Sequence, residues 1–309
     1  MTATTHTVCL TVAPEHAWLR LDAYLAQQLH WRSRRSLAEL LAAGAVVVNG
    51  RSVKKAHRLA AGDVIALVLP RPPEAEVDLG AIALRILYED DDLVVVDKSG
   101  DLAVHPASTC QHRNLVRRLE HHYRHEQPDP RVEPCVLHRL DRTTSGVVAL
   151  AKRRELIDFY TRQFAARTTT KRYVAIVHGR LEGEGTITLP LVTPEQRPSL
   201  VDPSGKPSRT DWRSLAATDH ATRLSITLHT GRKHQIRVHM ASQGHPLVYD
   251  EIYGHPPREA SPQPASPKGA RPLLHAAQLE LDHREGRRLV LSAPVPDDME
   301  RAWAELCAH

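Results

Sequence analysis

The sequence predicts an α+β protein with two domains, a small N-terminal α/β module and a larger, strand-rich domain. The chain has 309 residues, which is long enough to form two hydrophobic cores. Near the N-terminus, leucines at helical spacing alternate with short runs of valine, whereas later segments alternate apolar and polar residues with the period of strands. A proline-rich stretch at residues 70–74 separates the two patterns.

The N-terminal module is expected to contain two helices and three strands. Asn49-Gly50 is a strong hairpin signal because both central residues of such a turn take positive φ, and Gly44 is placed to stop the second helix. In chain order, the expected elements are a helix with Leu21, Leu25 and Leu29 on its apolar side, a helix from Ser33 to about Ala43, and strands at 46–48, 51–53 and 64–68.

The larger domain is expected to open with a hairpin around the acidic turn at residues 90–92. Residues 171–179 then alternate as a strand does, which places Tyr173 on the apolar face. A half-buried strand at 224–228 leads into a glycine turn and a helix that presents Ile236 and Met240 on one face. Gly244 is the expected cap of that helix, and a last strand is expected near 289–291.

These patterns set the expected domain boundaries. The N-terminal module covers residues 1–70, a linker covers 71–85, and the second domain covers 86–309. Within the second domain, residues 254–272 are dense in Pro, Ser and Gly. Such a segment cannot bury enough apolar surface to order itself, so a flexible loop is expected there.

Composition indicates a cytoplasmic protein with a polyanionic partner. The net charge is +5, and residues 142–172 carry eight Lys or Arg against two acidic residues. Clusters of this kind bind phosphates by releasing counterions. The four cysteines are scattered, which favours a reducing compartment over a disulfide scaffold. Neither a signal peptide nor an apolar run of about 18 residues is found, so no membrane association is expected.

One run concentrates the chemistry. In His138-Arg139-Leu140-Asp141-Arg142-Thr143-Thr144-Ser145-Gly146, a carboxylate stands between two arginines at a turn before an apolar strand. Nearby cations keep a carboxylate ionised at neutral pH, which suits a nucleophile or a general base. A surface salt bridge in a loop is the simpler interpretation of this run taken alone.

Further motifs in a fixed order change that interpretation. HRLDRTTSGVVALAK, KRYVAIVHG, TGRKHQIRVHMASQGHP and LLHAAQLEL, with the opening VVVDKSGDLAVHP, resemble the RluA-type pseudouridine synthases over residues 86–300. RLDAYLAQQL, SRRSLAELLAAGAVVVNG and AAGDVI resemble the alpha-L RNA-binding module first described in a small-subunit ribosomal protein. The resemblance implies a catalytic domain built on a mixed, largely antiparallel sheet with flanking helices.

The resemblance also implies roles for individual residues. Asp141 matches the catalytic aspartate, and Arg139 matches the arginine that helps to flip the target nucleotide. Tyr173 matches the tyrosine that packs against the base and can take the C5 proton. Arg237, or alternatively Arg232, matches the arginine that pairs with the aspartate. The substrate-binding set is completed by three residues of the same motifs, Lys171, His234 and Gln235.

The implied substrate is structured RNA, with large-subunit ribosomal RNA favoured and transfer RNA open. No metal or cofactor is needed, and a monomer is expected. The N-terminal module would bind RNA through cations at the start of its second helix and after its hairpin: Arg32, Arg34, Arg35, Lys54 and Lys55. The chain departs from the family pattern at Ser99, which replaces proline after Asp97-Lys98, and at Tyr249, which replaces glycine before Asp250.

Three other interpretations stay open at this point. A hydrolase with paired carboxylates would need a second acidic residue beside Asp141. A zinc site could be built from Cys110, His112, Cys135 and His138, although their spacing is unusual for zinc. A non-catalytic RNA-binding ribosome-assembly factor would keep the cations and dispense with the aspartate chemistry.

Overall fold

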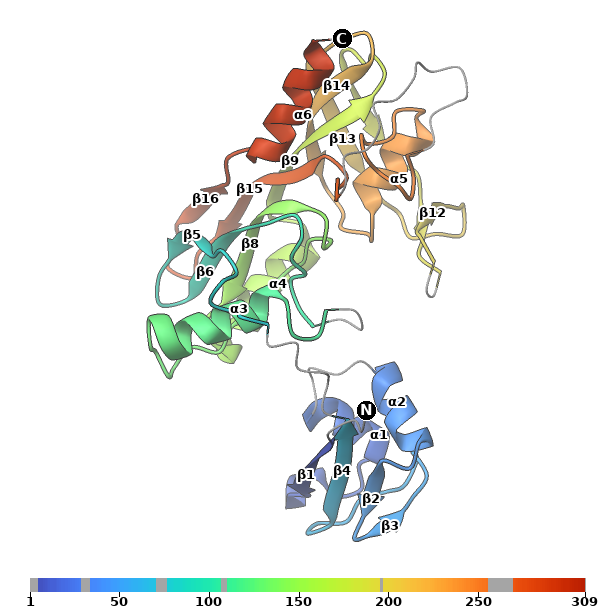
Figure 1. The fold of residues 1–309 in the computed structure, drawn as a ribbon, viewed down its shortest axis with the longest axis vertical. Helices are drawn as coiled ribbons and strands as arrows, with labels where there is room; N and C mark the ends of the chain where they lie inside the picture. Colours follow the sequence, from blue (N-terminus) through green and yellow to red (C-terminus); the bar gives the residue numbers. More distant parts are fainter. Residues whose placement is uncertain are drawn as a thin grey trace. The chain divides into compact units, whose positions relative to one another are not determined.

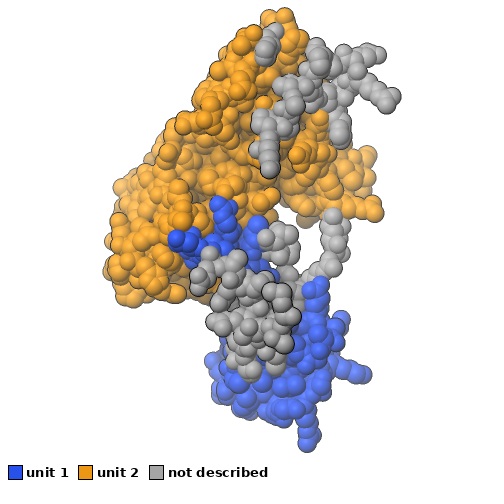
Figure 2. All heavy atoms as spheres, viewed as in Figure 1, with its two compact units in different colours: residues 1–79, 105–114 blue, residues 80–104, 115–309 orange. Residues whose placement is uncertain are grey.

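The computed structural model describes residues 5–28, 34–70, 77–106, 110–194, 197–254 and 269–308, without the side chains of 5–8, 34–36 and 68–70. It forms two compact units, one of residues 1–79 and 105–114 and the other of residues 80–104 and 115–309. Figure 2 colours the two units separately. Of the predicted linker, residues 71–76 lie outside the described residues and 77–85 are described, whereas most of the predicted flexible loop, residues 255–268, lies outside them.

The first unit is a four-stranded antiparallel sheet with two helices. Its strands lie in the order β1-β4-β2-β3. The turn between β2 and β3 has positive φ at Asn49 and Gly50, as the Asn-Gly signal predicts. The elements are β1 (Thr5–Thr11), the 3₁₀ turn η1 (Pro14–His16), α1 (Leu21–Gln28), α2 (Arg34–Ala42), β2 (Val46–Val48), β3 (Arg51–Ser52) and β4 (Val64–Pro70).

The core of this unit is formed by the residues that sequence periodicity selects. Leu21 and Leu25 of α1 are fully buried, and they pack with Leu37 of α2 and Ile65 of β4. Aliphatic side chains therefore hold the two helices on the sheet. The predicted second helix, from Ser33 to about Ala43, agrees with α2 to within a residue at each described end.

The second unit contains a ten-stranded mixed sheet. The main path is β10-β13-β14-β9-β15-β8-β6-β5, with β16 paired to β15 and β7 paired to β8. Its strands are β5 (Arg85–Glu89), β6 (Leu93–Lys98), β7 (Cys135–Val136), β8 (Ser145–Ala151), β9 (Thr170–His178), β10 (Glu184–Ile187), β13 (Thr210–Ala217), β14 (Ala221–Leu228), β15 (Leu274–Asp282) and β16 (Arg288–Ser292). A separate hairpin pairs β11 (Leu191–Val192) with β12 (Leu200–Val201).

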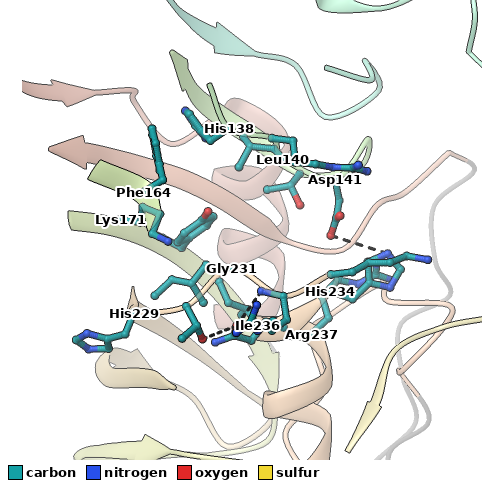
Figure 3. A pocket seen from close by; sticks show the side chains of 18 of the residues that line it. His138, Leu140, Asp141, Phe164, Lys171, His229, Gly231, His234, Ile236 and Arg237 are labelled. Atoms are coloured by element: carbon teal, nitrogen blue, oxygen red, sulfur yellow. Dashed lines mark hydrogen bonds and ion pairs between the residues drawn. The ribbon is translucent and has the colours of Figure 1, made fainter. Parts of the chain in front are cut away.

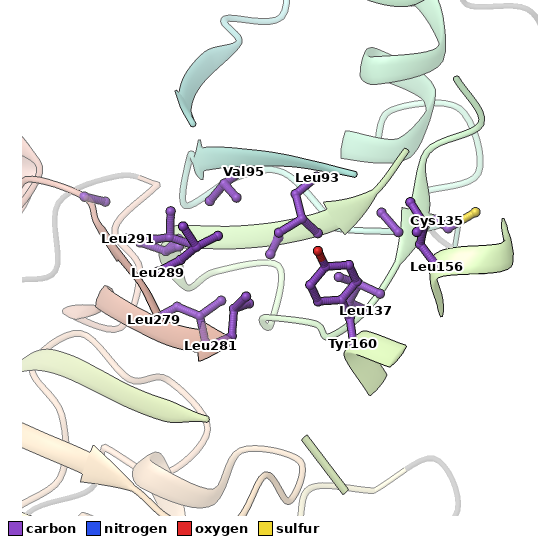
Figure 4. Close-up of a cluster of buried hydrophobic side chains, with 14 residues drawn as sticks. Leu93, Val95, Cys135, Leu137, Leu156, Tyr160, Leu279, Leu281, Leu289 and Leu291 are labelled. Atoms are coloured by element: carbon purple, nitrogen blue, oxygen red, sulfur yellow. The ribbon is translucent and has the colours of Figure 1, made fainter. Parts of the chain in front are cut away.

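Short helices cover this sheet. They are α3 (Leu115–His121), which continues as the π-helix η2 (His122–Glu126), the 3₁₀ turn η3 (Arg154–Leu156), α4 (Ile157–Ala166), α5 (Gln235–Ser242) and α6 (Asp297–Cys307). Figure 1 shows α6 beside the β9 and β14 region of the sheet, where its Met299 packs with Ile176. Tyr160 of α4 packs at the other end, in a cluster with Leu93 and Leu281 (Figure 4).

The pairing of β15 with β8 determines where the Asp141 loop lies. β15 and β8 are parallel, with His275 opposite Ser145 and Ala276 opposite Gly146, while the other pairs of this sheet are antiparallel. The loop before β8 is the Asp141 run, so it emerges where the sheet changes direction. The predicted mixed, largely antiparallel sheet is confirmed. Within the described part of the chain, no helix is long and apolar enough to cross a membrane.

Candidate active site

A cavity of about 600 Å³ opens beside the Asp141 loop. Its walls come from that loop, the end of α4, β9, the end of β14 and the turn that starts α5 (Figure 3). The eight predicted catalytic and substrate-binding residues come from three separate motifs of the sequence. The cavity brings all eight together: Arg139, Asp141, Lys171, Tyr173, Arg232, His234, Gln235 and Arg237. Asp141 is the one carboxylate among the described residues that line it.

Two buried cations hold the Asp141 loop by its backbone. Lys98, at the end of β6, is 1% exposed and donates to the carbonyls of Ser99, Leu102 and Arg142. Burial lowers the pKa of Lys98 to about 7. Arg271 donates to the carbonyl of Thr143 at 3.2 Å. Consecutive carbonyls after Asp141 are thus each held by a cation.

The strand behind the loop admits no side chain at one position. Gly146 has φ of 114°, and a Cβ there would lie 2.2 Å from the carbonyl oxygen of Ala276 on β15. The neighbouring Ser145 hydroxyl accepts from Arg271 and contacts Nδ1 of His275 at 2.9 Å. Ser145 and Gly146, at the end of the motif, therefore allow β8 and β15 to approach closely and hold them together.

Tyr173 lies on β9 and is 8% exposed. On the two neighbouring strands, the residues directly opposite Tyr173 are Ala276 of β15 and Ile226 of β14. Burial and then the charge of Asp141 raise the pKa of Tyr173. Its hydroxyl therefore keeps its proton at neutral pH, and the ring forms an apolar wall of the cavity.

The ion pair expected for Asp141 is made elsewhere, which corrects the sequence interpretation. Arg237 donates from Nε and Nη2 to the two carboxylate oxygens of Asp250, at 2.6 and 2.7 Å. Both side chains are at most 4% exposed. Such a fork-to-fork pair uses the planar guanidinium fully, and it forms because the turn after Leu247 returns Asp250 to α5. Nε2 of the His234 imidazole lies 4.0 Å from Oδ2 of Asp141.

Gln235 also has a different role from the one expected. Its side-chain oxygen accepts from the Thr230 hydroxyl and the Arg232 backbone N–H, and its nitrogen donates to Arg209 and Thr210. All its bonding groups are used within the protein, so it shapes the turn instead of binding substrate. Arg232 itself donates to the Pro207 carbonyl at 3.4 Å.

Arg139 and Lys171 are the two further cations expected to bind substrate, and both line the cavity. Arg139 is exposed in the Asp141 loop. Lys171 lies on β9, and burial followed by the charge of Arg167 lowers its pKa. Two cations in the lining of one cavity suit a phosphate-bearing ligand.

His138, the first residue of the motif, is scaffold. Its Nε2 accepts the backbone N–H of Ala149 at 3.0 Å, and its ring stacks on Phe164. Burial lowers its pKa to about 3, so the ring is neutral. The described residues contain no group of three or more His, Cys, Asp or Glu side chains that could hold a metal ion, so the zinc interpretation gains no support.

The RNA-binding residues expected in the first unit are described in part. Lys54 and Lys55 are exposed after the β2–β3 hairpin. Arg32 lies outside the described residues, and so do the side chains of Arg34 and Arg35, whose backbone starts α2.

Comparison with known proteins agrees with both units. Residues 92–242 match the RNA pseudouridylate synthase family, and residues 19–65 match the S4 domain. The chain is 37% identical over 298 residues to ribosomal large subunit pseudouridine synthase D of Nitrosomonas europaea, covering 95% of this chain and 86% of the relative. The protein of the same name from Salmonella typhimurium is 35% identical over 298 residues, covering 94% and 91%.

A solved structure shares the fold. Human RNA pseudouridylate synthase domain containing 4 superposes with a TM-score of 0.60 at 24% identity, covering 72% of this chain and 92% of that one. Fold and cavity together define an RNA pseudouridine synthase. The chain belongs to the RluA-type family of these enzymes and carries an N-terminal S4 domain, as the sequence resemblance implies.

Sequence reasoning missed three residues that shape the site: Lys98, Asp250 and Arg271. A lysine that ends an otherwise buried strand is a signal that could have identified Lys98, because such a cation needs acceptors close by. The other two act across 13 and 128 residues, on Arg237 and Thr143, and no local pattern reports those contacts.

Proposed function

We propose that this enzyme isomerises uridines of large-subunit ribosomal RNA, with Asp141 as its catalytic nucleophile or base. The observation that carries the proposal is that Asp141 is the one carboxylate among the described residues of a cavity whose lining also holds several cations and Tyr173. Isomerisation must break the bond from uracil N1 to the ribose, rotate the base and rejoin it at C5. One ionised carboxylate suffices for this chemistry, whereas a paired-carboxylate hydrolase needs two.

The ribosomal substrate is supported by the names of the relatives and by the S4 domain. Transfer RNA is the alternative substrate. We further propose that the protein works in the cytoplasm as a monomer. Arg139, exposed beside Asp141, would occupy the gap left when the target nucleotide leaves its stack.

The test is Asp141→Asn, assayed by release of tritium from RNA that contains uridine labelled at C5. We expect the rate to fall at least about 1,000-fold, as when the group acting on the reacting atoms is lost, while RNA affinity and thermal unfolding stay unchanged. Asp158→Asn, an exposed aspartate on α4, is the control. Tritium release at the wild-type rate from Asp141→Asn would contradict the assignment.

Mapping pseudouridines in total RNA from a strain that lacks the gene identifies the substrate. Loss of pseudouridine from large-subunit ribosomal RNA supports the proposal, and loss from transfer RNA alone favours the alternative. A complete set of pseudouridines in that strain, together with an inactive purified protein, would favour the non-catalytic assembly factor.

A further inference from the structure

His234 lies at the N-terminus of α5 in a backbone conformation that non-glycine residues rarely adopt. It is the N-cap of the helix and has φ of 56° and ψ of 20°, in the left-handed region. Its side chain is 13% exposed, and Nε2 lies 4.0 Å from Oδ2 of Asp141. Figure 3 shows the two side chains next to each other, with this contact drawn as a dashed line. A backbone held in a sparsely populated region beside a reactive group points to a functional constraint.

Hydrogen bonds fix which ring nitrogen carries the proton. The Tyr253 hydroxyl donates to the carbonyl of Ser199 at 3.1 Å, and this uses its single hydrogen. The same hydroxyl lies 3.0 Å from Nδ1 of His234, so it must accept there and Nδ1 must donate. In the neutral ring, Nε2 therefore carries the free lone pair, and that lone pair faces the Asp141 side of the cavity.

Tyr253 is itself held by the buried ion pair. Asp250 accepts the backbone N–H groups of Ile252 and Tyr253, each at 3.1 Å, while it pairs with Arg237. The Arg237 guanidinium also lies over the Tyr253 ring, 5.1 Å from its centre. The Arg237–Asp250 pair thus holds Tyr253, and Tyr253 in turn holds the imidazole of His234 through Nδ1.

The electrostatic surroundings keep the imidazole neutral at pH 7. Burial lowers the pKa of His234 below its usual 6.5, and this effect outweighs the opposing charge of Asp141. Of the other groups that face it, Arg237 and Lys233 lower the pKa and Asp250 raises it, while Tyr253 supplies the hydroxyl described above. Tyr173 keeps its proton, as its raised pKa requires, and is a poor base.

We propose that His234 is the base that removes the proton from C5 of the isomerised uracil. After the bond between C5 and ribose C1′ forms, C5 holds a hydrogen and N1 is doubly bonded to C6. Nε2 takes this proton, the C5–H electrons form the C5–C6 double bond, and the N1–C6 π electrons move to N1. N1 then takes a proton from water, and the imidazolium returns its proton to the hydroxide that remains. The step therefore involves no net gain or loss of protons or electrons.

This inference rests on the proposed function of Asp141, and it reassigns the C5 proton from Tyr173 to His234. The base is needed in one step alone. All earlier steps, which break the bond to N1 and form the bond to C5, leave the C5 hydrogen in place. An RNA whose target base has fluorine at C5 therefore runs through the earlier steps and has no proton to lose at the last.

The experiment compares His234→Gln with wild type in the full chain on two RNAs, one with uridine and one with 5-fluorouridine at the target. We expect formation of pseudouridine to fall about 100-fold, the lower end of general-base effects. Rearrangement of the 5-fluorouridine RNA, followed by chromatography and mass spectrometry of its nucleosides, stays at the wild-type rate. Asp141→Asn loses both reactions.

Further variants separate a base from a structural role. Tyr253→Phe removes the acceptor of Nδ1, and we expect it to slow the uridine reaction about tenfold and to spare the 5-fluorouridine reaction. His220→Gln, an exposed histidine on the β13–β14 turn, is the matched control and changes neither. The wild-type uridine rate should fall as pH drops below the pKa of His234, and His234→Gln should lack this acid limb.

Two results would overturn the assignment. Equal losses on both RNAs in His234→Gln, or a loss on neither, would remove His234 as the base. Wild-type protein that converts neither RNA would instead count against the proposed function, and the two failures are therefore distinct. Thermal unfolding of each variant separates loss of fold from loss of chemistry.

Discussion

At the scale of the residue, the use of each polar atom decides which side chains of the motifs can meet RNA. The side-chain amide of Gln235 makes all its hydrogen bonds within the protein, and the guanidinium of Arg237 pairs with the carboxylate of Asp250. His234 commits Nδ1 to Tyr253 and keeps Nε2 toward the cavity. Residues from one short segment thus divide between scaffold and chemistry, although the sequence presents them as one basic cluster.

Gly146 provides a stability prediction at this scale. Gly146→Ala would combine a side chain at φ of 114° with a contact of 2.2 Å to backbone that cannot rotate away. We expect the free energy of unfolding to fall by about 3 kcal/mol or more, measured by urea denaturation.

Gly244→Ala is the comparison, because φ there is 80° and no atom lies within 4 Å of the added methyl. Its cost should be about 1 kcal/mol. Equal costs for the two substitutions would mean that the β8–β15 contact is not rigid.

At the scale of the element, local patterns predict the parts of the fold and of the site that lie within one segment. The strand that carries Tyr173, the hairpin turn at Asn49 and the helix after the basic turn each follow from a period or a turn signal in a few consecutive residues. The Asp141 motif is likewise one continuous run. Its loop is nevertheless positioned by Lys98 and Arg271, from 44 and 128 residues away.

Those distant contacts escape sequence reasoning for a physical reason. Residues 271 and 143 meet because β15 joins β8 in parallel, and strand order is set by the packing of the whole sheet. The predicted pairing of Arg237 with Asp141 is wrong for the same reason, since it depends on contacts that no local pattern reports. The charge of Asp141 acts on Arg237, but the turn after α5, which periodicity does not encode, places Asp250 as the partner of its guanidinium.

The contacts of Arg271 with the Asp141 loop lead to a prediction. Arg271→Met removes its bonds to Thr143, Ser145 and Asp298. We expect the free energy of unfolding to fall by about 2–4 kcal/mol, since buried acceptors lose their donor. Asp141 would also lose its fixed position, so kcat should fall about 100-fold while KM changes little.

Asp298→Asn isolates the outer half of this contact. Asp298 is 45% exposed on α6, and its loss leaves the bonds from Arg271 to the loop intact. A half-exposed pair contributes about 0–1 kcal/mol, and kcat should stay near wild type. A kcat that falls equally in both variants would place the effect in α6 and not in the loop.

At the scale of the whole molecule, the S4 domain and the catalytic unit belong to one chain, so binding by one raises the effective concentration of RNA at the other. This tethering separates affinity from chemistry. Cations of the S4 domain should govern how tightly RNA is held and how steeply binding depends on salt, whereas the rate on saturating RNA should depend on the Asp141 cavity.

The double variant Lys54→Gln, Lys55→Gln tests this separation, because both side chains are exposed. Each lost phosphate contact should lower the slope of log K against log salt by about 0.7–0.9, and the double variant by up to twice that. We expect weaker RNA binding in filter or fluorescence titrations and an unchanged kcat at saturating RNA. Arg213→Gln, Arg301→Gln removes two exposed charges from the catalytic unit as the control. An unaltered salt slope in the lysine variant would show that these two lysines do not contact RNA phosphates.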